Sequence, residues 1–144
     1  MMYQEIIVDN CSMQLVQSPS TFDVMVLPNL YGAIMANIMA GLLGSPGLIP
    51  GCNIGKEYVL FEQGVRHAGL DIAGKNVANP TGLLLASVMM LRNLNMPLFA
   101  ERIQHGIFQT LYEGKVRTPD IGGISTSTEF VDEILRNIEK HTKH

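Results

Sequence analysis

Two consecutive predicted helices constrain the fold of this chain more than any other part of its sequence. Asn79 and Pro80 begin the first helix, because Asn is a favourable cap and Pro fits the first helical position. This helix continues to about Asn93 with apolar residues on nearly all sides: Leu83, Leu84, Leu85, Val88, Met89, Met90 and Leu91. Pro97 begins the second helix and Gly114 ends it. A helix that is apolar all round must be covered, so the first helix belongs in a core or at a subunit interface.

Short strands are predicted to alternate with helices in the rest of the chain. Apolar and β-branched runs predict strands at residues 5–8, 22–27 and 58–61. Helices are predicted at residues 9–17, where Asp9 or Asn10 is the cap, at 30–44, and from Thr126 to the C-terminal tail. Thr126 and Glu129 have the spacing of a capping box. The stretch 45–55 contains three Gly and two Pro and is predicted as turns.

This alternation places the chain in the α/β class. A complete doubly wound nucleotide-binding sheet has about five or six strands, and fewer are predicted in this sequence. No G-x-G-x-x-G phosphate-binding sequence follows a strand. We therefore expect residues 1–144 to form a single partial domain, with an incomplete sheet and helices packed on it.

Composition excludes several classes of partner. Hydrophobic residues make up 47% of the chain, which is enough to form a core. The net charge of −3 and the pI near 5.7 argue against nucleic acid as a partner. The apolar stretch Ala33–Leu43 is too short to cross a bilayer, so no membrane partner is predicted. The first residues have neither a signal-peptide pattern nor an Arg-rich transit pattern.

Four blocks of sequence, in order along the chain, carry a resemblance to a known family. They are Val8-Asp9-Asn10 with Met13-Gln14-Leu15-Val16; Phe22-Asp23-Val24-Met25-Val26 with Asn29-Leu30-Tyr31-Gly32; Phe61-Glu62 with Asp71-Ile72-Ala73-Gly74-Lys75 and Ala78-Asn79-Pro80-Thr81; and Arg117-Thr118-Pro119-Asp120-Ile121-Gly122-Gly123. Together they resemble the β-decarboxylating dehydrogenases, the isocitrate and isopropylmalate family. Tyr31 and the Gly122–Gly123 pair resemble the mitochondrial NAD-dependent isocitrate enzyme. The resemblance implies the C-terminal part of that fold.

The resemblance also implies a chemistry. Members of this family oxidise a 2-hydroxy acid by hydride transfer to NAD or NADP and then release CO2. A divalent metal, Mg or Mn, polarises the hydroxyl group and later stabilises the enolate. Such a metal requires hard oxygen ligands, so its site is built from carboxylates and substrate. The family implies location in the mitochondrial matrix.

The metal site departs from the family's pattern. Catalytic members carry two Asp one helical turn apart, and at those positions this chain has Ala33 and Asn37. Residues four apart share a helix face, as a ligand pair must, but Ala offers no ligand and Asn at best one neutral oxygen. The resemblance makes Asp9 the carboxylate that reaches a metal across the subunit interface; its alternative role is to cap the first helix. We therefore predict no catalytic residues in this chain.

A loop also departs from the catalytic pattern. Residues 64–72 are one residue longer than the corresponding catalytic segment and lack its Pro. The Arg66–His67 pair in this loop resembles the regulatory subunits of the family. Both departures favour a regulatory subunit, of beta or gamma type, over a catalytic one.

The resemblance assigns a set of residues to nucleotide or effector binding: Arg66, His67, Ala68, Asp71, Asn79 and Asp120. The loop 66–68 matches the family segment that contacts the adenine nucleotide, and Asn79 matches the residue that reads the adenine edge. Asp120 lies where the family places residues near the ribose. Alternatives remain for several of them: a solvated polar loop for 66–68, a helix cap for Asn79, and a loop-fixing role for Asp71.

Three functional hypotheses follow. The first is a regulatory subunit that pairs with a catalytic isocitrate dehydrogenase subunit in a hetero-oligomer and binds ADP with Mg, and citrate, while the partner binds NAD. The second is a catalytic dehydrogenase subunit. The third is an inactive truncated fragment that acts only through partner binding. The apolar predicted helices at 30–44 and 81–93 are the expected subunit contacts.

Overall fold

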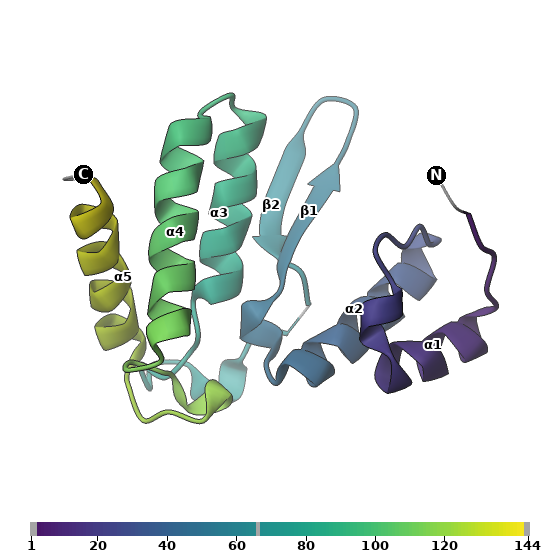
Figure 1. Cartoon of the computed structure of the whole chain (residues 1–144), viewed down its shortest axis with the longest axis horizontal. Helices are drawn as coiled ribbons and strands as arrows, with labels where there is room; N and C mark the ends of the chain where they lie inside the picture. The colour runs from purple at the N-terminus through teal and green to yellow at the C-terminus, as the bar shows by residue number, and fades with distance from the viewer. Residues whose placement is uncertain (1–2, 66, 143–144) are drawn as a thin grey trace.

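A computed structural model describes residues 3–65 and 67–142. The helices α3 (Thr81–Asn93), α4 (Pro97–Glu113) and α5 (Ser127–Thr142) lie side by side at one end of the molecule (Figure 1). A two-stranded hairpin of β1 (Pro50–Ile54) and β2 (Val59–Gln63) packs against α3. The helices α1 (Val8–Gln17) and α2 (Asn29–Leu43) form the other end (Figure 1). The α/β class is confirmed, with a smaller sheet than predicted.

Side-chain caps fix where the C-terminal helices begin. Asn79 Oδ1 accepts the backbone N–H of Thr81, the first residue of α3, at 3.0 Å. The cap position itself is taken by Pro80, so the predicted cap and first helical residue are each displaced by one. At α5, Glu129 Oε2 accepts the Thr126 backbone N–H at 2.7 Å, and Glu129 N donates to Thr126 Oγ1 at 3.2 Å. The capping box is therefore confirmed. These backbone and side-chain hydrogen bonds from Thr126 lower the pKa of Glu129.

The main apolar core lies between α3, α4 and α5. Its buried members come from all three helices: Val88, Ala100, Ile107, Phe130 and Ile134. The helices α4 and α5 approach closely at Gly106, where an added Cβ would lie 2.5 Å from Ile138 Cγ1. The apolar α3 is thus covered by α4 on one side and by the hairpin on another, while Leu83 and Met90 stay exposed.

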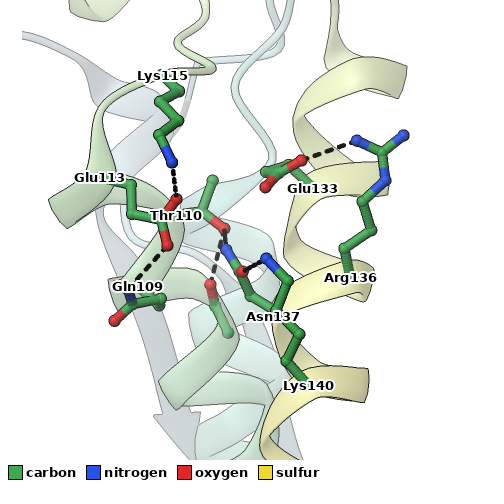
Figure 2. Close-up of polar contacts among 9 residues, drawn as sticks. Gln109, Thr110, Glu113, Lys115, Glu133, Arg136, Asn137 and Lys140 are labelled. Carbon is green, nitrogen blue, oxygen red and sulfur yellow. Dashed lines mark hydrogen bonds and ion pairs between the residues drawn. The ribbon is translucent and has the colours of Figure 1, made fainter.

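A buried polar contact sets α5 against α4 (Figure 2). Asn137 Nδ2 donates to Thr110 Oγ1 at 3.0 Å, and the Thr110 hydroxyl donates to the Gly106 carbonyl at 2.8 Å. Lys140 Nζ donates to Asn137 Oδ1 at 3.2 Å. Asn137 and Thr110 are both buried, and buried polar groups are stable only when paired in this way. The contact fixes one register between the two helices.

The hairpin partly confirms the predicted strands. The strand expected at 58–61 is β2, which pairs antiparallel with β1, Cys52 standing opposite Phe61. The turn prediction for 45–55 is confirmed at Pro46–Leu48, which form the short helix η2, and was wrong for Pro50–Ile54, which form β1. The three Gly and two Pro of that stretch have low strand propensity, so the sequence did not indicate β1. The strand forms because its backbone hydrogen-bonds to β2.

Two predicted strands were wrong. Residues 5–8 run into α1, which begins at Val8, and 22–27 form no ladder. Val24 and Val26 in that second run are 72% and 96% exposed. A strand exists only where another strand accepts its hydrogen bonds, and none of the described residues does so. The apolar run therefore stays irregular.

The predicted helices of the N-terminal part are confirmed with small shifts. α1 ends at Gln17 as predicted, but no side chain caps its start. Asp9 Oδ1 instead accepts the backbone N–H of Asn10 at 2.7 Å. α2 ends at the predicted Gly44 cap. None of the described helices combines the length and apolarity that a bilayer crossing needs.

Candidate functional site

A pocket of about 650 Å³ lies at the N-terminal end of α3. Its walls come from residues 45–47, from Gln63 at the end of β2, from the long loop 67–79 and from the turn at Asp120. In Figure 1 these segments meet beneath the α3–α4–α5 layer. Loops supported by a packed helical layer are a common setting for ligand sites.

The pocket gathers the residues that the sequence assigned to nucleotide binding. His67, Ala68, Asp71, Asn79 and Asp120 all line it. Arg66 lies outside the described residues. Glu62 of β2 is not among the pocket-lining residues; its side chain accepts Asn53 Nδ2 of β1 at 2.8 Å.

Asn79 joins the helix start to the pocket wall. Its Nδ2 donates to Asp120 Oδ2 at 3.0 Å across 41 positions of sequence, while its Oδ1 caps α3. The other Asp120 oxygen accepts the hydroxyl of Thr118. A role for Asn79 at the start of α3 is therefore compatible with a role in the pocket. Its amide oxygen binds the helix N–H, and the residue also lines the pocket. Thr118 was missed by the sequence analysis, although it stands inside the quoted block around Asp120.

The loop 67–79 supplies further polar groups. The Gly69 backbone N–H donates to His67 Nδ1 at 3.3 Å. Asp71 is the middle residue of the short helix η3 (Leu70–Ile72) and is exposed. A carboxylate, an imidazole and an amide on one pocket wall can pair with the hydroxyl and base-edge groups of a nucleotide.

The family's metal-ligand positions do not fit a metal ion in this chain. Ala33 and Asn37 share a face of α2 and line a hollow of about 500 Å³ with Leu30, Ile34 and Ile38. Asn37 Nδ2 donates to the Ala33 backbone oxygen at 2.8 Å, which leaves one neutral oxygen. In residues 3–65 and 67–142, no three His, Cys, Asp or Glu side chains gather as a metal site would need. An apolar hollow with one amide oxygen cannot replace the hydration shell of Mg²⁺.

Comparison with known proteins identifies the family. A family model described as isocitrate/isopropylmalate dehydrogenase matches residues 1–134. The chain belongs to this family. Among solved structures, an isocitrate dehydrogenase from Methylococcus capsulatus superposes with a TM-score of 0.87 at 38% identity, over 92% of this chain and 40% of that one. A β-decarboxylating dehydrogenase from Thermococcus kodakarensis gives 0.83 at 31% identity, over 96% and 40%.

Curated relatives include subunits named as catalytic and subunits named as regulatory. Mitochondrial NAD isocitrate dehydrogenase subunit 1 of Kluyveromyces lactis is 50% identical over 137 residues, which are 95% of this chain and 38% of that protein. Catalytic subunit 5 of Arabidopsis thaliana is 53% identical over 136 residues (94% and 36%), and regulatory subunit 1 of the same plant is 50% identical over 140 (95% and 38%). This chain therefore spans less than two-fifths of their length. Overall identity does not separate the two roles.

Proposed function

We propose that this chain is a regulatory, non-catalytic subunit of a mitochondrial NAD-dependent isocitrate dehydrogenase, which converts isocitrate to 2-oxoglutarate. The observation that carries the proposal is the pair Ala33 and Asn37 at the family's metal-ligand positions. The mitochondrial location follows the names of the relatives, of which the Kluyveromyces lactis and Arabidopsis subunits are examples.

The local structure at this pair supports the absence of catalysis. Two negative charges are missing where a dication must be held, and the Asn37 amide group is turned to the helix backbone. The neighbouring side chains Leu30, Ile34 and Ile38 are apolar, so they would remove water from an ion without replacing its ligands. In this proposal a catalytic partner binds the metal and NAD and carries out the chemical step. Asp9 of this chain is proposed to contribute a ligand to the partner's metal site.

The pocket at α3 supports an effector role. Asn79, Asp120, His67, Ala68 and Asp71 line a space large enough for a nucleotide, and the proposed effectors are ADP with Mg, and citrate. Effector binding regulates a partner only if its affinity differs between two states of the assembly. α2 is the proposed contact with the catalytic subunit, because its apolar side chains Leu30, Ile34 and Leu42 are exposed.

The test is isocitrate-dependent NADH formation by a catalytic subunit, with and without this chain and with and without Mg-ADP. We expect the chain alone to be inactive and its addition to confer activation by ADP. Asn79→Ala should abolish the activation, whereas Glu139→Ala, exposed on α5 and remote from the pocket, should leave it intact. NADH formation by the chain alone would favour the catalytic alternative, and an unchanged partner rate would favour the inactive fragment.

A further inference from the structure

Thr118 is fully buried beside the pocket without lining it. Its side chain has 0% exposure, and its hydroxyl donates to Asp120 Oδ1. Asp120 is the exposed pocket residue that the hydroxyl holds. A buried donor to a carboxylate makes a charge-assisted hydrogen bond, which is among the stronger ones in proteins.

The turn around Thr118 leaves little freedom to this hydroxyl. The Thr118 carbonyl accepts the backbone N–H of Ile121 at 3.2 Å and of Gly123 at 3.0 Å. The Arg117 carbonyl accepts the Ser125 N–H at 2.9 Å, and a Cβ added to Gly123 would lie 1.9 Å from that carbonyl oxygen. The turn is thus closed by its own backbone, and it fixes the position from which the hydroxyl donates.

The hydrogen bonds continue from Thr118 to the start of α3. Asp120 accepts Thr118 on one oxygen and Asn79 Nδ2 on the other. Asn79 Oδ1 accepts the Thr81 N–H. If the Asn79 amide were rotated by half a turn, its oxygen would face the carboxylate and its NH₂ would face the helix N–H. Both contacts would be repulsive, so the amide has one orientation.

We infer that Thr118 is a positioning residue of the nucleotide pocket. Its hydroxyl fixes the orientation of the Asp120 carboxylate, and the carboxylate fixes the orientation of the Asn79 amide. The pocket then presents one amide N–H and one fixed carboxylate to a nucleoside diphosphate. This inference rests on the proposed function, because the pocket must bind a nucleotide. Preorganised polar groups raise affinity, since the ligand does not have to order them.

The experiment is calorimetric titration of Mg-ADP into the purified chain and its variants. Thr118→Val keeps the shape and removes the hydroxyl, and we expect the affinity to fall about tenfold, the effect of losing a hydrogen bond to a charged group. Thr118→Ser keeps a hydroxyl and should bind within about twofold of the parent chain. Thr110→Val removes another buried hydroxyl, on α4, and should lower the melting temperature without changing the affinity.

A second pair of variants tests whether Thr118 acts through Asp120. In an Asp120→Ala background, Thr118→Val should change the affinity no further. Equal affinity of the parent chain and Thr118→Val overturns the inference alone, as does an additive effect in the Asp120→Ala background. No binding to the parent chain overturns the proposed nucleotide site as well. If the valine variant does not fold, Thr118→Ala, which adds no methyl group in place of the hydroxyl, takes its place with the same expected loss.

Discussion

The two ends of this molecule differ in how completely they cover their own apolar residues. At the C-terminal end, α3, α4 and α5 enclose a core in which Ile107 and Phe130 are fully buried. At the N-terminal end, α1 and α2 enclose a smaller cluster, whose buried members are Cys11, Leu15 and Met35. There Val24 and Val26 of the irregular run 22–27 and the outer face of α2 stay exposed, although Phe22, Met25 and Leu27 pack against the small cluster.

The proposed ligand pocket and the proposed subunit contact lie at different ends of the molecule. The pocket that Asn79 and Asp120 line lies at the C-terminal end, which holds the larger buried core. Ala33 and Asn37, the positions where the resemblance expects metal ligands, belong to α2 at the N-terminal end, whose outer face exposes apolar residues. The proposed effector pocket is lined by residues of this chain, whereas the proposed contact of α2 depends on a partner that would pack against it.

The largest expected effect concerns the cores themselves. Phe130→Ala should lower the free energy of unfolding by about 3–5 kcal/mol, because it opens a cavity in a fully covered core. The matched change Val26→Ala at the exposed N-terminal run should stay within about 0.5 kcal/mol. Denaturant unfolding followed by circular dichroism measures both. Similar losses for the two variants would break the comparison.

Two glycines give opposite expectations for the same substitution. Gly106→Ala should destabilise by about 1–3 kcal/mol, because the new Cβ meets Ile138 and α5 must shift. Gly41→Ala, in the last turn of α2 with no atom within 4 Å of the new Cβ, should stabilise by up to about 0.5–1 kcal/mol through helix propensity. Thermal melts of the two variants sharpen the comparison. A stabilised Gly106→Ala chain would show that α4 and α5 are packed less tightly than described.

The buried polar contact of Figure 2 should be sensitive to removal of one partner only. Asn137→Ala leaves the Thr110 hydroxyl and Lys140 without their amide partner, and should cost about 1–3 kcal/mol. Replacing both buried groups, as in Thr110→Val with Asn137→Leu, should cost less than the sum of the single changes. Denaturant midpoints of the four chains complete this cycle, and strict additivity would argue against a direct contact.

The smallest expected effect is a pH dependence at the start of α5. The pKa of Glu129 is lowered from 4.5 by its Thr126 hydrogen bonds, so the folded state favours the charged form. The resulting stability is present above the carboxyl's ordinary pKa and is lost as the pH falls through the lowered value. Glu129→Gln keeps the capping geometry and should flatten this acid limb. Melting temperatures measured across the acid range test it; identical acid limbs would contradict the assignment.

Local chemistry was enough to predict most helix boundaries. The Asn79–Pro80 start, the Gly44 and Gly114 ends and the Thr126–Glu129 box lie within a few residues of the ends they set. In such caps, residues close in sequence form hydrogen bonds with the unpaired backbone groups at the helix end. No distant contact is therefore needed to predict them. The strands were less predictable, because β1 exists through its pairing with β2 and the run 22–27 finds no partner among the described residues.

The sequence by itself determined the helical layer, the family resemblance and the absence of the metal-binding Asp pair, since each rests on residue types and short spacings. Only the tertiary structure decided how the site is assembled. The contact between Asn79 and Asp120 joins residues 41 positions apart, and the role of Thr118 depends on the direction of one buried hydroxyl. That direction is set by the closed turn 117–125, whose backbone hydrogen bonds no residue pattern specifies in advance.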